Sequence, residues 1–212
     1  MKYFNLFSKK YKKVLAFDGG GVRAIMGVYF LKRLEQETSR SIFDSFDLFI
    51  GTSAGAINAL MLGINGSSIT DIEEFWTKAN LRKIMNQSFI DKTSILQTRP
   101  KYSNVGKKEI LSRFFADKEI GAALKPVIVT AYDLEKRQPV LISSYKDSKV
   151  SVVEAANASS AAPIYFPTAG MNDGRWLIDG GIATNNPSLL GYVEAKKLFG
   201  TNHIRILSLI HI

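Results

Sequence analysis

Short apolar runs alternate with longer segments of mixed polarity along most of this chain. The apolar runs predict strands at residues 14–17, 46–50, 126–131, 139–144, 175–178 and 204–207. Helical periodicity predicts helices at residues 27–38, 56–62, 107–115 and 150–162, with another beginning near residue 70. This alternation predicts an α/β fold, a three-layer α/β/α domain with a mainly parallel central sheet. The ligand crevice of such a fold lies outside the carboxyl ends of its strands.

Two polar segments refine this pattern. Thr70-Asp71-Ile72-Glu73 has the form of a capping box and predicts the start of a helix. The apolar side of that helix consists of Ile69, Ile72, Phe75, Trp76 and Ala79. Residues 82–104 are polar and irregular, and two interpretations of them are open: a cap over an acyl-chain groove, or a loop with a short helix.

Composition is that of one globular domain. Of the 212 residues 46% are hydrophobic, and no linker, repeat or low-complexity tract interrupts the sequence. The chain has no cysteine, which excludes disulfides and thiolate metal sites, and its two histidines form no cluster of metal ligands. We therefore expect no metal and no cofactor. Because the lack of cysteine fits a reducing compartment best, we expect a cytoplasmic protein.

The chain is basic, with a formal net charge of +9. Residues 1–13 are rich in lysine and aromatic residues and lack the apolar stretch of a secretory signal, and no run is long enough to cross a bilayer. Two interpretations are open: attraction to an anionic membrane surface, worth about 1 kcal/mol per nearby cation, or a solvated terminus. No nucleic-acid-binding motif accompanies the charge, so we expect no nucleic-acid partner. We divide the chain into a basic segment, 1–13, and one domain, 14–212.

Ser53 is the first candidate for chemistry. It lies in Gly51-Thr52-Ser53-Ala54-Gly55, between the predicted strand at 46–50 and the predicted helix at 56–62. A serine on a sharp strand-to-helix turn is typical of a nucleophile elbow, and the flanking glycines avoid collisions with the strand and helix. By itself the short pattern more often marks close helix–strand packing.

A glycine-rich loop precedes it in the chain. Gly19, Gly20 and Gly21 follow Asp18 at another strand-to-helix junction, and Arg23 comes two residues later. Bare amides at such a junction bind an anion, either a phosphate or the oxyanion formed during acyl transfer. The loop lacks both the Gly-Lys-Ser/Thr of a phosphate loop and the G-x-G-x-x-G of a dinucleotide site, which favours the oxyanion.

Asp179 is the candidate partner of the serine. It ends the predicted strand at 175–178 and is followed by Gly180 and Gly181, so another group can approach it closely. A serine hydrolase ordinarily uses a histidine as its base. His203 precedes the predicted strand at 204–207, so we expect it at the end of the sheet opposite Ser53.

Together these motifs resemble the patatin-like phospholipases, which use a Ser-Asp dyad without a histidine. The segment 158–167 and Asn185-Asn186-Pro187 also resemble that family's pattern, and the resemblance runs from residue 18 to residue 187. It implies a lipid acyl hydrolase of the phospholipase A type that acts on phospholipids or other acyl lipids through an acyl-enzyme. The implied catalytic residues are Ser53 and Asp179. The implied oxyanion hole is Gly19, Gly20 and Gly21, and the motif is supported by Arg23, Gly51, Gly55, Gly180 and Gly181.

The sequence departs from the family pattern in two places. Ala24 stands where many members have glycine. Residues 207–212 read as the in-frame translation of a transposase adapter used in DNA library preparation, so we expect the C-terminal end of the domain to be incomplete and His211 to have no role. Two alternatives to the dyad hydrolase stay open: a histidine-assisted α/β-hydrolase-type esterase that uses His203, and a non-catalytic anion-binding protein of the same fold.

Overall fold

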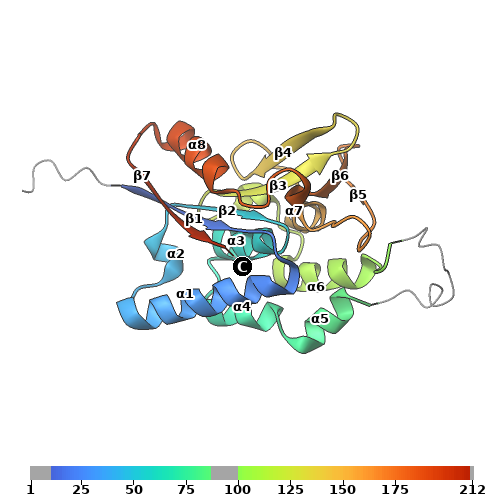
Figure 1. The fold of residues 1–212 in the computed structure, drawn as a ribbon, viewed down its shortest axis with the longest axis horizontal. Helices are drawn as coiled ribbons and strands as arrows, with labels where there is room; N and C mark the ends of the chain where they lie inside the picture. The colour runs from blue at the N-terminus through green and yellow to red at the C-terminus, as the bar shows by residue number, and fades with distance from the viewer. Residues whose placement is uncertain (1–10, 87–99, 211–212) are drawn as a thin grey trace, which may run out of the picture.

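The computed structural model describes residues 11–86 and 100–210 as a central sheet with helices on both faces (Figure 1). The strands are β1 (Lys12–Phe17), β2 (Leu48–Thr52), β3 (Val127–Asp133), β4 (Gln138–Ser143), β5 (Ala169–Gly170), β6 (Trp176–Asp179) and β7 (Ile204–Leu209). The α-helices are α1 (Ala24–Thr38), α2 (Ile42–Ser45), α3 (Ala54–Asn65), α4 (Ile69–Phe75), α5 (Lys78–Ile84), α6 (Val105–Phe115), α7 (Val152–Ser159) and α8 (Ser188–Phe199).

The sheet has the order β5-β6-β3-β2-β1-β7, and β4 pairs with the other edge of β3. Strands β7, β1, β2 and β3 are parallel, whereas β4 and β6 run antiparallel to β3, and β5 runs antiparallel to β6. The predicted α/β architecture with a mainly parallel sheet is therefore confirmed.

Strands β2 and β6 meet end to end along one edge of β3. Because β4 pairs with residues 128–133 along one edge of β3, both β2 and β6 must use the other edge. Thr52, the last residue of β2, pairs with Thr130, and Asp179, the last residue of β6, pairs with the next residue, Ala131. Two strands of opposite direction thus bring their carboxyl ends to the same point of the sheet.

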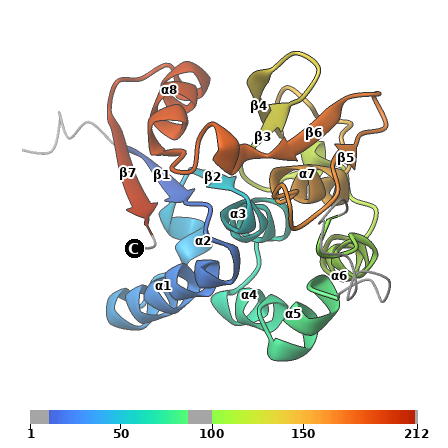
Figure 2. The same ribbon diagram turned by 45° about the vertical axis from the view of Figure 1, so that its right-hand side comes forward.

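The two faces of the sheet are covered unequally. Side chains alternate along each strand, so Leu15 and Phe17 face the larger apolar core while Val14 and Ala16 face the smaller one. Helix α8 covers the smaller core, and α1 and α3 to α6 lie on the opposite face, as two views agree (Figure 2). Every residue of α3 from Ala54 to Ile64 is buried, which makes this helix a rigid support for the turn that precedes it.

Several element boundaries differ from the sequence prediction. The capping box predicted at Thr70 is wrong: Ser68 caps α4, and its side chain and that of Asp71 exchange hydrogen bonds with each other's backbone amides. Helix α7 covers only the middle of the predicted 150–162, and β1 begins at Lys12, before the boundary expected at residue 14. Lys12 forms an ion pair with Asp47 at 2.9 Å. In the described part of the chain, no helix combines the length and apolarity that crossing a membrane requires.

Candidate active site

Ser53 occupies the turn between β2 and α3 with backbone angles of φ 55° and ψ −124°. A positive φ is uncommon for a residue with a side chain, and strained backbone of this kind persists only where the surroundings enforce it. The backbone amide of Ser53 donates a hydrogen bond of 3.0 Å to Ser159 Oγ, which fixes the turn from the side of α7. The turn has the geometry that the sequence pattern predicted.

The glycines on both sides of Ser53 allow the turn to close. A Cβ atom on Gly55 would lie 2.5 Å from the carbonyl oxygen of Asp18 and 2.7 Å from that of Phe17. A Cβ atom on Gly51 would run into the backbone of Gly55. Because the obstacles are backbone atoms, neither collision can be relieved by moving a side chain.

Asp179 reaches Ser53 from β6 and is held by three hydrogen bonds. Its Oδ2 accepts from the Ser53 hydroxyl at 2.5 Å, and its Oδ1 accepts from the amide of Gly181 at 2.7 Å. Its own amide donates to the carbonyl oxygen of Ala161 at 3.1 Å. Burial raises the pKa of Asp179 above its ordinary value, although the hydrogen bonds from Ser53 and Gly181 and the charge of Lys107 oppose the rise.

The strand ends that carry the pair are joined by two threonines. Thr52 and Thr130 share a hydrogen bond of 2.8 Å between their hydroxyl groups, and Thr52 also donates to the carbonyl oxygen of Thr184 at 2.9 Å. Gly180 passes so close to Thr130 that a Cβ atom there would collide with it. This contact gives Gly180 a packing role beside Asp179.

The glycine-rich loop lies beside the serine, but its three glycines are not equivalent. Gly20 and Gly21 line the same cavity as Ser53. The amide of Gly19 instead donates to the carbonyl oxygen of Asn185 at 3.0 Å, and the expected place of Gly19 in the oxyanion hole stays a prediction. A Cβ atom on Gly19 would lie 2.5 Å from Asn185 Oδ1 and 3.4 Å from the Cβ of Ser53, so this position must be small for steric reasons.

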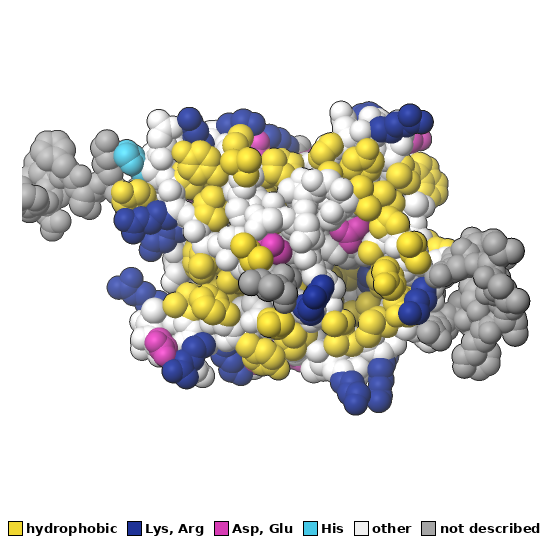
Figure 3. All heavy atoms as spheres, in the orientation of Figure 1, with side chains coloured by type: hydrophobic (Ala, Val, Ile, Leu, Met, Phe, Trp, Pro, Cys, Tyr) yellow, Lys and Arg dark blue, Asp and Glu magenta, His cyan; other side chains and the backbone are white. Residues whose placement is uncertain are grey.

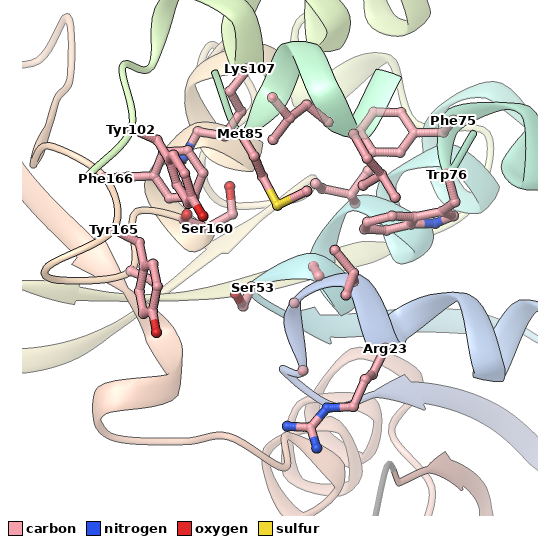
Figure 4. Close-up of a pocket in the computed structure, with 18 residues that line it drawn as sticks. Arg23, Ser53, Phe75, Trp76, Met85, Tyr102, Lys107, Ser160, Tyr165 and Phe166 are labelled. Atoms are coloured by element: carbon pink, nitrogen blue, oxygen red, sulfur yellow. The ribbon is translucent and has the colours of Figure 1, made fainter. Parts of the chain in front are cut away.

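Ser53 opens into a cavity of about 480 Å³. Phe75 and Trp76 lie to one side of it and Tyr102 and Phe166 to the other (Figure 4). The remaining apolar side chains of the lining include Val22, Ala54, Ile57, Leu81, Ile84, Met85 and Ala162. Apolar side chains also gather on the face of the molecule seen in Figure 3. Ile164 and Tyr165 are among the exposed large hydrophobic residues. The cavity is shaped for a largely apolar ligand.

The irregular segment predicted at 82–104 contributes to this cavity from both of its described ends. Ile84 and Met85 line the cavity before the gap at 87–99, and Tyr102 lines it after the gap. The middle of the segment lies outside the described residues, so the two interpretations of it stay predictions.

Arg23 also borders the cavity. Figure 4 shows it on the opposite side of Ser53 from Lys107, with its guanidinium directed away from the apolar side chains. Its side chain has no ion-pair partner among residues 11–86 and 100–210. Its predicted role beside the motif stays a prediction.

Lys107 is a residue of the site that the sequence pattern did not reveal. It lies on α6, is only 2% exposed, and lines the cavity. Its ammonium donates to the carbonyl oxygens of Ser160 at 3.0 Å and Asn157 at 3.4 Å, and lies 4.0 Å from the centre of the Phe166 ring. Burial lowers the pKa of Lys107 to about 7, although the charge of Asp179 raises it.

The histidine lies away from this site. His203 directly precedes β7, and its carbonyl oxygen accepts a hydrogen bond from Lys12 at the start of β1. Its ring contacts Tyr11, at the end of the parallel strands opposite Ser53, as predicted. His211 lies outside the described residues. Within the described part of the chain, no three His, Cys, Asp or Glu side chains are grouped so as to hold a metal ion.

Comparisons with known proteins relate this chain to one family. A family model described as patatin-like phospholipase matches residues 15–190. The chain is 29% identical to Patatin-like protein 4 of Arabidopsis thaliana over 92% of this chain and 54% of that protein. It is 32% identical to a cGAMP-activated phospholipase of Pseudomonas aeruginosa over 86% of this chain and 56% of that protein. The chain therefore spans little more than half the length of these curated relatives.

A solved structure is similar in fold. VipD from Legionella pneumophila matches with a TM-score of 0.57 and 17% sequence identity, over 82% of this chain and 46% of that chain. At this level of identity the likeness supports the fold alone.

Proposed function

Because the chain belongs to the patatin-like phospholipase family, we propose that it is a lipid acyl hydrolase that cleaves carboxylic esters of membrane lipids. One observation carries the proposal: the Ser53 hydroxyl donates a hydrogen bond of 2.5 Å to Asp179 beside an apolar cavity. A hydroxyl paired with a carboxylate is a candidate nucleophile with its base, and the apolar cavity suits an acyl chain.

In the proposed mechanism, Ser53 Oγ attacks the ester carbonyl while Asp179 takes the proton of the hydroxyl. The oxygen that becomes negative is stabilised by the amides of Gly20 and Gly21, each typically worth about 3 kcal/mol. The ester C–O bond then breaks, and Asp179 returns the proton to the leaving alcohol. Water attacks the acyl-enzyme by the same route, releases the fatty acid and restores Ser53. No step in this sequence requires a cofactor.

An aspartate is ordinarily a weak base, and two features of this site favour it in that role. Burial raises the pKa of Asp179, which brings it closer to the pH at which it must accept a proton. The short hydrogen bond to Ser53 aligns the hydroxyl with the carboxylate before the substrate binds.

We assign the parts of the lipid from the chemistry of the lining. The acyl chain occupies the apolar part of the cavity, near Phe75, Trp76 and Met85. Arg23, an exposed cation at the rim, faces the phosphate of the headgroup. The net charge of +9 draws the protein to an anionic membrane surface, where it acts as a peripheral enzyme.

The position of His203 speaks against a histidine-assisted esterase, because it is separated from Ser53 by the length of the parallel strands. The non-catalytic alternative requires that Ser53 be unreactive, which labelling with a fluorophosphonate decides.

The experiment is lipid hydrolysis. Wild-type protein and Ser53→Ala are incubated with vesicles of mixed phospholipids, galactolipids and neutral lipids, and the products are identified by mass spectrometry. The proposal predicts free fatty acid and the corresponding lysolipid with the wild type and neither product with Ser53→Ala. Equal product from both proteins, or none from a folded wild type, would refute it.

A further inference from the structure

We propose that Lys107 is a positioning residue for the Ser53–Asp179 pair, acting on it through the C-terminal end of α7 and through its positive charge. The inference rests on the proposed hydrolase function and adds to it a residue on a separate helix, α6. It is built on two sets of contacts that converge on residues 157–161 and on the effect of the Lys107 charge on Asp179.

The first set joins Lys107 to the end of α7. Its ammonium donates to the carbonyl oxygens of Asn157 and Ser160, at the last turn of the helix. Carbonyl groups at a helix C-terminus lack partners within the helix and carry partial negative charge, so a cation there satisfies and stabilises them. The face of Phe166 covers the ammonium at 4.0 Å and excludes water from it.

The second set joins the same segment to the candidate nucleophile and base. Ser159 Oγ accepts the hydrogen bond from the amide of Ser53, and the carbonyl oxygen of Ala161 accepts from the amide of Asp179. The five residues from 157 to 161 therefore contact the ammonium, the turn of the nucleophile and the backbone of the base. A shift of this segment moves Ser53 and Asp179 relative to each other, and small misplacements of reacting groups are costly to the rate.

The third contribution is electrostatic. The charge of Lys107 lowers the pKa of Asp179 and so opposes the effect of burial on this carboxyl group. The charged groups that act on Lys107 are Asp179, from β6, and Lys108, its neighbour on α6. Arg23, Tyr102 and Tyr165 are the other titratable side chains that line the same cavity.

A purely structural role explains this lysine less well. Desolvating a charge destabilises a fold, and an apolar side chain of similar volume is often equally good or better for stability at such a position. A buried cation beside a candidate base is therefore typical of a site where charge serves the chemistry.

The inference predicts a bell-shaped dependence of activity on pH. Activity rises with pH as Asp179 loses its proton and falls as Lys107 loses its own near pH 7, where burial places its pKa. The two limbs belong to the coupled pair, since each charge shifts the titration of the other.

The experiment compares Lys107→Met, Lys107→Arg and Lys108→Met with the wild type, by kcat and KM for a short p-nitrophenyl ester across pH. Lys108 is exposed one residue further along α6 and is the matched control. We expect Lys107→Met to lower kcat about tenfold to a hundredfold with little change in KM. Its acid limb should move to higher pH, and the alkaline limb near neutrality should vanish.

The other two variants separate charge from packing. Lys107→Arg keeps a cation that does not titrate in this range, so its acid limb should stay in place while the alkaline limb moves up. Lys108→Met should keep the kcat of the wild type and a bell-shaped profile, with the alkaline limb moved slightly to higher pH because the charge of Lys108 lowers the pKa of Lys107.

Three results would overturn the inference. One is a folded Lys107→Met protein with the kcat and both limbs of the wild type. If Lys107→Met does not fold, two other results overturn the inference. The first is a wild-type pH profile without an alkaline limb near neutrality, and the second is an alkaline limb that stays at the same pH in Lys107→Arg. A wild type that hydrolyses no ester refutes the proposed function itself, and the inference with it.

Discussion

The hydroxyl of Ser53 lies 2.5 Å from a carboxylate oxygen of Asp179, although 126 positions separate the two in the chain. The contact follows from the arrangement of the sheet. Strand β2 ends at Thr52, opposite Thr130, and β6 ends opposite the next residue of β3. Because the two strands run in opposite directions along one edge of β3, their carboxyl ends face each other, and each end carries one member of the pair.

The charge of Asp179 is held at a cost in stability, and we predict that Asp179→Asn makes the protein more stable near neutral pH. Its pKa in the folded state is raised above the ordinary 3.8, so the folded protein binds the proton more tightly than the unfolded chain does. Stability therefore falls as pH rises from 3.8 through the raised pKa, and the asparagine variant lacks this loss.

Urea unfolding of both proteins at several pH values measures the effect. The free energy of unfolding of Asp179→Asn should exceed that of the wild type by an amount that grows with pH over this window. A difference in the free energy of unfolding that is constant with pH, or of opposite sign, would contradict the conclusion that Asp179 is a buried carboxyl group with a raised pKa.

A side chain at Gly55, two residues after Ser53, should destabilise the protein. In Gly55→Ala the new methyl group would meet the carbonyl oxygens of Asp18 and Phe17 at 2.5 and 2.7 Å. Because overpacking against backbone is relieved only by moving strands, we expect a loss of about 1–3 kcal/mol in urea unfolding. Gly170→Ala is the control, since the atoms nearest to its new methyl group belong to the side chain of Trp176, at 3.3 Å, and not to the backbone. Equal unfolding midpoints for Gly55→Ala and the wild type would show that the turn has room for a methyl group at this position.

The apolar wall of the cavity should set the preference for acyl chain length. Met85 lines the cavity, and in Met85→Trp the larger ring fills space that a long acyl chain would use. The ratio of kcat/KM for a long-chain to a short-chain p-nitrophenyl ester should fall about tenfold. Met26→Trp, at an exposed position on α1, is the control and should leave this ratio as in the wild type. A ratio unchanged in Met85→Trp would place the acyl chain elsewhere.

His203 should be dispensable. Its ring packs against Tyr11 at the end of the parallel strands opposite Ser53, so we predict that His203→Ala keeps most of the esterase activity. The measurement is kcat/KM with a short p-nitrophenyl ester. Loss of activity in a variant that is shown by circular dichroism to be folded would support a histidine-assisted mechanism instead.

The turn at Ser53 was predictable because its determinants are local. A strand, two glycines and a helix lie within a few residues of Ser53, and their order alone predicts an exposed hydroxyl at a strained turn. The α/β class was predictable for the same reason, since alternating strands and helices are read from periodicity. The start of α4 was misplaced by two residues because Ser68 and Thr70 both fit the cap pattern locally, and only the structure selects Ser68.

Local sequence patterns do not predict the antiparallel direction of β6 or the role of Lys107. Lysine in a helix is ordinarily on the solvent face, and its carbonyl partners lie 50 and 53 residues further along the chain. Gly19 fits an oxyanion-hole motif in sequence, yet its amide is bound by Asn185, which comes from a distant loop. For β6, Lys107 and Gly19 alike, the deciding contact is with residues far away in the chain, so the local sequence pattern does not predict it.

The most direct test of this account is covalent labelling of Ser53. Wild type, Ser53→Ala and Asp179→Asn are treated with a fluorophosphonate, and the modified peptide is identified by mass spectrometry. We predict an adduct on Ser53 in the wild type, none in Ser53→Ala, and labelling of Asp179→Asn slowed about 10²–10⁴-fold, the usual contribution of a general base. A folded wild type that is not labelled at Ser53, or Asp179→Asn labelled at the rate of the wild type, would contradict the account.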